Sequence, residues 1–99
     1  MGELSQLKGL GLSSEKRLNE VGIFTRQQLS ALGAIHVFIT LEKYHGKTPS
    51  LNFLYALVGA IEDIPWQQVA QQERERLLIE LASAREFNAL LLNESDEQR

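Results

Sequence analysis

No cysteine occurs among the 99 residues, which excludes a disulfide framework and the zinc sites that cysteine ligands form. No stretch approaches the roughly 18 uninterrupted apolar residues that a membrane-spanning helix needs. The first residues, MGELSQLKG, lack the basic start and the long apolar segment of a signal peptide. These absences predict a cytoplasmic protein without membrane contact, whose stability comes from an apolar core.

The composition is that of an ordinary globular domain, with 43% hydrophobic and 23% charged residues. A chain of 99 residues has room for one core, which predicts a single domain. The net charge of −3 conceals an asymmetry: residues 1–50 carry +2, and residues 51–99 carry −5. Contact with nucleic acid is therefore expected from the first half only, and it is expected to be weak.

The segment 50–64, SLNFLYALVGAIEDI, predicts the central helix of the fold, because apolar residues leave no fully polar face before its last turn. Ser50 is a suitable N-cap, and Pro65 pushes the residue before it out of the helical region. Gly59 interrupts this helix and has two interpretations, the close approach of another helix or a glycine that the helix tolerates.

The remaining pattern predicts a compact all-α bundle of about five helices after a short N-terminal one. Thr25 and Gln28 have the spacing of a capping box at the start of one of them. The segment IHVFIT also permits a strand, but a lone strand would have no partner. The expected segments are 4–8, a helix from the cap Ser13 or Ser14 to Val21, 25–33, 34–44, 50–64, a connector at 65–69, and 71–93.

The turn Gly9-Leu10-Gly11 lies between two predicted helices and has the form of a helix-hairpin-helix element. Backbone N–H groups in such a turn and at the next helix N-terminus can hold a phosphate. A structural turn between packed helices is the alternative. The candidate DNA-binding residues are Lys8, Gly9, Gly11, Ser13, Lys16, Arg17 and Arg26.

No arrangement of residues typical of catalysis is recognisable. His36 and His45 are the only histidines, and their spacing of nine residues does not place two metal ligands on one helix face. The glutamates of the last predicted helix are explained by a solvated face. Trp66 is expected to cover the core at a helix junction. The sequence therefore predicts no enzyme, no metal site and no cofactor.

The last predicted helix carries two apolar stripes. Leu77, Leu81, Ala84, Leu91 and Leu92 form the stripe that is expected to face the core. Ile79, Phe87 and Leu90 lie with Ser83 on a second stripe. This second stripe predicts either contact with another part of the domain or a surface for a partner, including a second copy of the chain.

Two motifs at a defined spacing carry a family resemblance. They are LxGLGxxSxxRLxxxGIxTxxxLxxLGA over residues 7–34 and SLNFLYALVGAIEDIPW over residues 50–66. Together they resemble the C-terminal domain of the TfoX/Sxy family, bacterial regulators of natural competence, over roughly residues 5 to 80. The first motif alone is also similar to the C-terminal domain of the RNA polymerase α subunit. The sequence departs from the family pattern at Leu12-Ser13, where a Pro-Lys pair is frequent.

The resemblance implies an all-α domain over 1–93, followed by a frayed tail over 94–99. It also implies a non-enzymatic role in transcription of competence genes, acting with the cAMP receptor protein, and a further N-terminal domain in the regulators themselves. We therefore expect a regulatory module that binds a transcription-related protein partner and binds DNA weakly. The alternative is a structural, homodimerising domain without DNA-binding or regulatory activity of its own.

Overall fold

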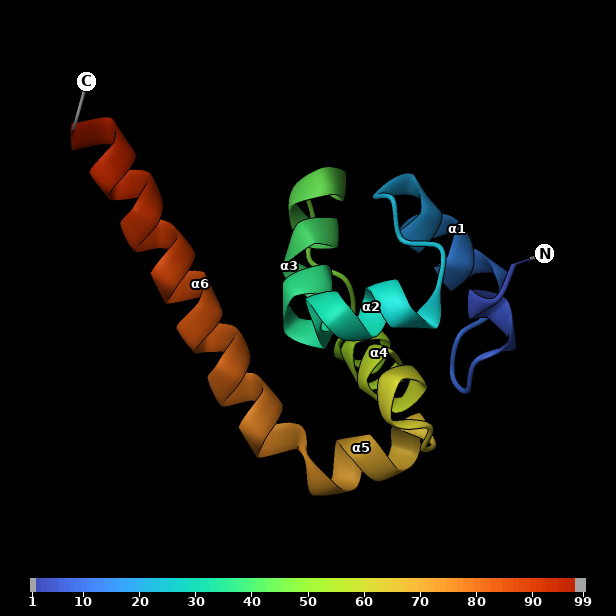
Figure 1. Cartoon of the computed structure of the whole chain (residues 1–99). Helices are drawn as coiled ribbons and strands as arrows, with labels where there is room; N and C mark the ends of the chain where they lie inside the picture. Colours follow the sequence, from blue (N-terminus) through green and yellow to red (C-terminus); the bar gives the residue numbers. More distant parts are fainter. Residues whose placement is uncertain (1, 98–99) are drawn as a thin grey trace.

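The computed structural model describes the backbone of residues 2–97 and the side chains of residues 2–91. Within this range the chain is entirely helical, which confirms the predicted all-α class (Figure 1). The elements are a 3-10 turn η1 (Leu4–Gln6) and six α-helices, α1 (Leu12–Glu20), α2 (Arg26–Leu32), α3 (Ala34–His45), α4 (Leu51–Glu62), α5 (Trp66–Gln72) and α6 (Arg74–Glu97).

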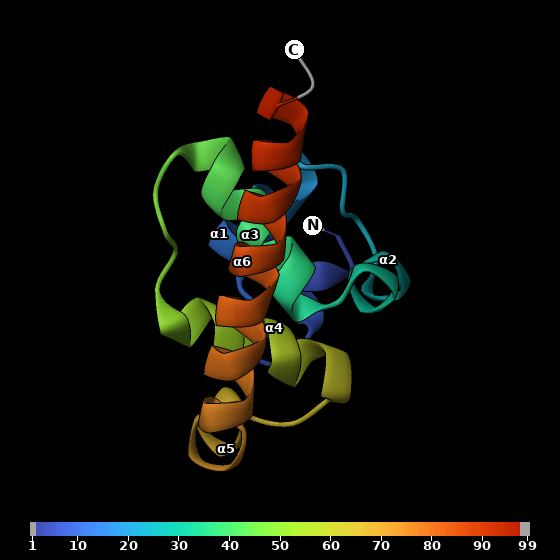
Figure 2. The same ribbon diagram turned by 90° about the vertical axis from the view of Figure 1, so that its left-hand side faces the viewer.

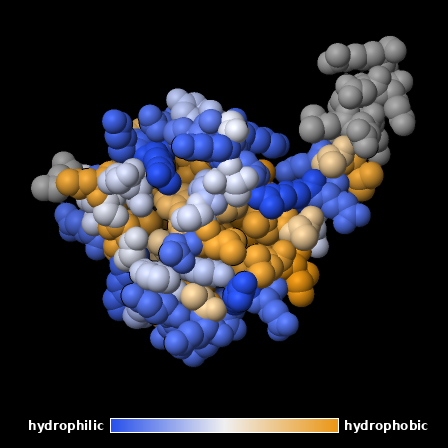
Figure 3. Space-filling view, turned by 180° about the vertical axis from the view of Figure 1, so that it is seen from behind, coloured by the Kyte–Doolittle hydropathy of each residue, from blue (hydrophilic) through white to orange (hydrophobic). Residues whose placement is uncertain are grey.

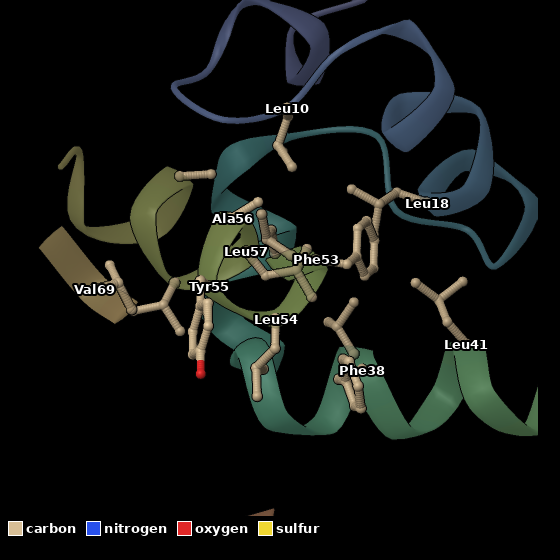
Figure 4. Packing of buried hydrophobic residues seen from close by; sticks show 14 of the residues in the cluster. Leu10, Leu18, Phe38, Leu41, Phe53, Leu54, Tyr55, Ala56, Leu57 and Val69 are labelled. Atoms are coloured by element: carbon tan, nitrogen blue, oxygen red, sulfur yellow. The ribbon is translucent and has the colours of Figure 1, made fainter. Parts of the chain in front are cut away.

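Helix α4 lies at the centre of the core, because its eight consecutive residues from Phe53 to Ala60 are buried. Helices α2, α3 and α5 pack against it, and its side chains meet those of α1 and α3 in Figure 4. Each other element contributes at least one buried apolar side chain, among them Leu4, Leu18, Leu29, Phe38, Val69 and Leu77. The predicted central helix is therefore confirmed, and it is enclosed on most sides.

The two predicted caps are present in the structure. The hydroxyl of Ser50 accepts a hydrogen bond from the backbone N–H of Phe53 at 3.3 Å. At α2 the capping box is complete: the Gln28 N–H donates to Thr25 Oγ1 at 3.1 Å, and the Thr25 N–H donates to Gln28 Oε1 at 3.2 Å. These local bonds satisfy donors that the first turn of a helix leaves free, so the sequence alone locates both starts.

Two predicted boundaries are wrong. Helix α1 begins at Leu12 after the N-cap Gly11, so Ser13 and Ser14 lie in its first turn and do not cap it. The segment predicted as a connector is the helix α5, and a break at Glu73 separates it from α6, which begins three residues later than predicted. The break turns the chain so that α5 packs on α4 while α6 packs on α3. The helix count therefore rises by one, and the helix-hairpin-helix arrangement stays a prediction.

Gly59 is required by the chain's own return into α5. A β-carbon at this position would lie 2.6 Å from the carbonyl oxygen of Ile64 and 3.4 Å from the backbone nitrogen of Trp66. The same turn is closed by a hydrogen bond of 3.0 Å from the Ile64 N–H to the Gly59 carbonyl. A close approach, one of the two interpretations of this glycine, is thus present, but it is made by a turn of backbone and not by a neighbouring helix.

Helix α6 lies across α3 and then extends beyond the globular part, as Figures 1 and 2 show. Of the stripe expected to face the core, Leu77 and Leu81 are buried and Ala84 is half-buried, but Leu91 is 47% exposed. The expected core stripe therefore ends near Ala84. Leu92 lies outside the described side chains. The helix includes residues 94–97 of the predicted frayed tail, and residues 98–99 lie outside the described range.

Glu15 is a buried carboxylate that holds the N-terminal segment against α1. Its side chain is 6% exposed and accepts hydrogen bonds from the backbone N–H groups of Gly2, at 3.1 Å, and Ser5, at 3.2 Å. The bond from Gly2 has the largest effect on the pKa of Glu15 and lowers it, while burial acts in the opposite direction. The charged form is therefore the one that the fold stabilises.

We expect the variant Glu15→Gln to be less stable than the original chain at pH 7. A carboxyl with a lowered pKa stabilises the fold above its ordinary value of 4.5, and this contribution is lost as the pH falls through the lowered value. Urea unfolding at several pH values measures the difference, which should shrink below pH 4.5. Glu86→Gln, on the exposed face of α6, is the control. A difference that is constant across this range would contradict the prediction.

Candidate functional site

A hollow of about 300 Å³ opens beside the turn at Gly9, where the N-terminal ends of three helices meet. Its walls are formed by residues of α1, α4 and α5 and by the turn, namely Gly9, Ser13, Ser14, Arg17, Ser50, Asn52, Phe53, Ala56 and Trp66. Neither α1 nor α5 has a side-chain cap at its N-terminus. Free N–H groups at helix N-termini carry partial positive charge, so the hollow is suited to an anion.

Arg17 gives this hollow its formal charge. Its guanidinium carbon lies 5.4 Å from the centre of the Phe53 ring, a cation–π arrangement that restricts where the charge can lie. Gly9 has a φ of +80° and faces Ala56 of α4, whose β-carbon would lie 3.4 Å from a β-carbon at residue 9. The turn therefore needs glycine, because its left-handed backbone disfavours residues that carry a β-carbon.

The structure divides the predicted DNA-binding residues into two groups. Gly9, Ser13 and Arg17 line the hollow together, whereas Lys8, Gly11 and Lys16 are exposed outside its lining. Arg26 lies elsewhere, on α2, and its Nη2 donates a hydrogen bond of 2.7 Å to the carbonyl oxygen of Ile61. This carbonyl belongs to the last turn of α4, where carbonyl groups have no partner within the helix. Arg26 thus has a structural contact, and its role toward DNA stays a prediction.

Leu12 is an exposed residue of this surface that the sequence analysis did not select. It is the first residue of α1, 61% of it is exposed, and Lys16 follows one turn later on the same side of the helix. The signal in the sequence was the departure from the family pattern at this position. An exposed leucine beside a lysine is a combination that another protein surface can bury.

A second surface lies on α6, where the three side chains of the second apolar stripe are exposed. The exposed fractions are 66% for Ile79, 59% for Phe87 and 57% for Leu90. The three side chains are therefore not buried against another part of the domain, which was one of the two alternatives for this stripe. Figure 3 shows hydrophobic side chains reaching the surface next to the projecting helix. Whether a partner binds there stays a prediction.

A groove of about 670 Å³ runs beside this stripe, between α6, α3 and the C-terminal ends of α2 and α4. Its apolar lining comes from segments far apart in the sequence, and includes Leu32, Ile35, Ile39, Val58, Ile61, Leu77, Ala84 and Phe87. Phe87 belongs both to the groove and to the exposed stripe. The groove was not predicted, because no local pattern reveals which helix ends meet.

Charged side chains lie at or near the groove, and one ion pair joins α6 to α3. Arg76 pairs with Glu73 and, at 2.8 Å, with Glu80, while Arg85 Nη2 lies 2.8 Å from Oε2 of Glu42 on α3. Burial, followed by the nearby Glu73 carboxylate, raises the pKa of Glu62 at the end of α4. The groove therefore combines charged side chains of both signs with an apolar lining.

Neither of these surfaces contains a recognisable metal centre. Among the described side chains, those of residues 2–91, no group of three or more His, Asp or Glu is placed to hold a metal ion. No helix in the described part of the chain combines the length and the apolar character that a membrane crossing needs.

Residues 1–81 match the protein family described as the TfoX C-terminal domain. The chain is also similar to a protein of Haemophilus influenzae named DNA transformation protein TfoX, at 32% identity over 90 residues. That match takes in 91% of this chain and 41% of the relative, so the chain spans less than half the length of the curated protein.

A solved structure of an uncharacterized protein from Listeria monocytogenes has a similar fold. The TM-score is 0.73 at 26% identity, with 85% of this chain and 94% of that chain covered. The family match covers all elements from η1 to α5 and the first turns of α6. The sequence motifs, the helical fold and these matches agree, and the chain belongs to the TfoX C-terminal domain family.

Proposed function

We propose that the chain is a non-catalytic module in the regulation of DNA transformation, which binds a transcription-related protein partner and contacts DNA weakly. The link to transformation comes from the Haemophilus influenzae relative and its printed name. The observation that carries the protein-binding role is the exposed Leu12 at the start of α1, with Lys16 beside it. Contact with a phosphate backbone alone would leave this leucine without an apolar partner, whereas a protein surface can bury it.

The chemistry of this face also indicates what kind of partner fits it. Lys8, Lys16 and Arg17 surround the turn, so the matching surface carries acidic groups around an apolar contact. Burial of Leu12 would contribute about 1.5–3 kcal/mol when complete. The same basic groups can contact DNA phosphates, which is why the two interactions share one face in this proposal.

A domain exchange tests the regulatory role. The matched region of the Haemophilus influenzae relative is replaced with this chain, and transformation frequency is measured. We expect transformation to be retained, and we expect Leu12→Glu to lower it at least tenfold while the helical content stays the same. Leu51→Glu, at a leucine of α4 that is 36% exposed, is the control. Loss of transformation in the unmutated exchange, or an unaffected Leu12→Glu variant, would contradict the proposal.

DNA contact is supported separately by the hollow at the hairpin, where Arg17 and three helix N-termini surround one space. Few phosphates can be neutralised there, so binding should be weak, insensitive to sequence and steeply dependent on salt. The net charge of −5 in the second half of the chain reduces the attraction between the domain and DNA at distances beyond the Debye length, which is about 10 Å at 0.1 M salt. The DNA contact is therefore secondary to the protein contact.

We expect the double variant Lys16→Glu, Arg17→Glu to abolish binding to a labelled DNA duplex, as measured by fluorescence anisotropy at low and moderate salt. Of the two single variants, Arg17→Glu should weaken DNA binding more than Lys16→Glu, because Arg17 lines the hollow and Lys16 does not. Lys47→Glu, which makes the same charge change in an exposed loop residue, should have a smaller effect. No detectable binding of the original chain at low salt would remove the DNA contact and leave the protein-partner role standing.

A further inference from the structure

The residues of the exposed stripe of α6 follow one another at nearly the same intervals whether the helix is read from its N-terminus or from its C-terminus. Ile79, Ser83, Phe87 and Leu90 are four, four and three residues apart, and at 3.6 residues per turn they occupy a sector of about 80°. If a second α6 runs antiparallel beside the first, Ile79 lies opposite Leu90 and Ser83 lies opposite Phe87. A small side chain then faces the largest one, which is how interdigitating helices fill space.

We propose that a second copy of this chain binds to this stripe, with the two α6 helices antiparallel and the two-fold axis close to residues 84 and 85. The pairing is isologous, because each copy presents the same side chains to the other. This inference does not depend on the proposed regulatory role, since it uses α6 and not the hairpin face.

The area that a dimer requires brings the groove into the interface. A stable interface buries about 800 Å² on each partner, which is more than three exposed apolar side chains supply. Phe87 joins the stripe to the groove of about 670 Å³, whose lining includes Leu32, itself 46% exposed. A partner helix that packs on the stripe at Phe87 therefore also covers the mouth of this groove. The two surfaces become one continuous interface.

Light scattering tests the association. At micromolar concentration the full chain should have about twice the mass of 11.2 kDa, and Phe87→Glu should return it to the monomer mass with unchanged helical content. Ala89→Glu is the matched control, because it adds the same charge to an exposed position outside the stripe and should leave the dimer intact. Leu90→Glu provides a second test if Phe87→Glu does not fold. A monomer at all concentrations, or a dimer that survives both stripe variants, would overturn the proposal.

Cysteine crosslinking tests the direction of the pair, and the absence of native cysteine makes the experiment unambiguous. Ile79→Cys and Leu90→Cys are prepared as separate single variants and oxidised alone or as a mixture. An antiparallel pair should give a crosslinked dimer in the mixture and little in either variant alone. Crosslinking of each variant with itself would show a parallel pair and would overturn the proposed geometry.

Discussion

Leu57→Ala and Leu54→Ala should each lower the free energy of unfolding by about 2–5 kcal/mol, the range found when a buried leucine is replaced by alanine. Both side chains are fully buried in the middle of α4, where the helices that surround them leave little freedom to collapse into the space created. The loss therefore includes the transfer of apolar atoms and the energy of the cavity that remains. Urea unfolding followed by circular dichroism measures it.

The matched control is Leu51→Ala, in the first turn of the same helix. This leucine is 36% exposed, so its truncation should cost less than about 1 kcal/mol. A loss below 1 kcal/mol at both Leu54 and Leu57 would be incompatible with α4 as the centre of the core. A domain of this size has a total stability of roughly 5–15 kcal/mol, so either core variant should also be visibly closer to unfolding at room temperature.

Gly59→Ala is the second large effect that we expect, with a loss of about 1–3 kcal/mol, as for overpacking at a well-packed site. Helix propensity alone predicts the opposite sign, because alanine is favoured over glycine in a helix by about 1 kcal/mol. The steric effect should dominate, since the new methyl group would lie 2.6 Å from the Ile64 carbonyl oxygen. That oxygen is part of the backbone and can move only if the turn into α5 moves.

Gly11→Ala is the comparison that separates the two effects. A β-carbon at residue 11 would meet no atom within 4 Å, and its φ of −113° is accessible to alanine. The stability of this variant should change by less than about 1 kcal/mol, because only the N-cap preference is affected. Denaturant midpoints of the two variants, measured side by side, check the prediction. A Gly59→Ala variant that is as stable as the original chain would show that the turn can relax.

Gly59 also illustrates where sequence reasoning stops. The close approach of another helix was one of two interpretations of this glycine, but the atoms that approach it belong to the residues that follow the helix. Likewise Trp66–Gln72 has only one fully buried side chain, Val69, which is too little periodicity to distinguish a helix from a connector. Its helical state depends on packing against α4 and on the change of direction at Glu73.

The candidate surfaces were predictable to different degrees. The stripe of Ile79, Phe87 and Leu90 follows from helical periodicity, and these residues are exposed as a partner surface requires. At the Gly9 turn, Gly9, Ser13 and Arg17 of the predicted set line one hollow, but the contribution of Trp66 and the α4 N-terminus to that hollow was not foreseen. Arg26 was grouped with them by charge alone, whereas its guanidinium group binds the end of α4.

The sequence by itself determined the features that depend on neighbours within about four residues. These are the all-helical class, the caps at Thr25 and Ser50, and the burial of α4, because cap bonds and helical periodicity are local. Only the tertiary structure decided the break at Glu73, the groove beside α6 and the place where the core stripe of α6 ends. Each of these depends on which distant side chains lie opposite a given residue, and a helical pattern specifies that a face is apolar without specifying what covers it.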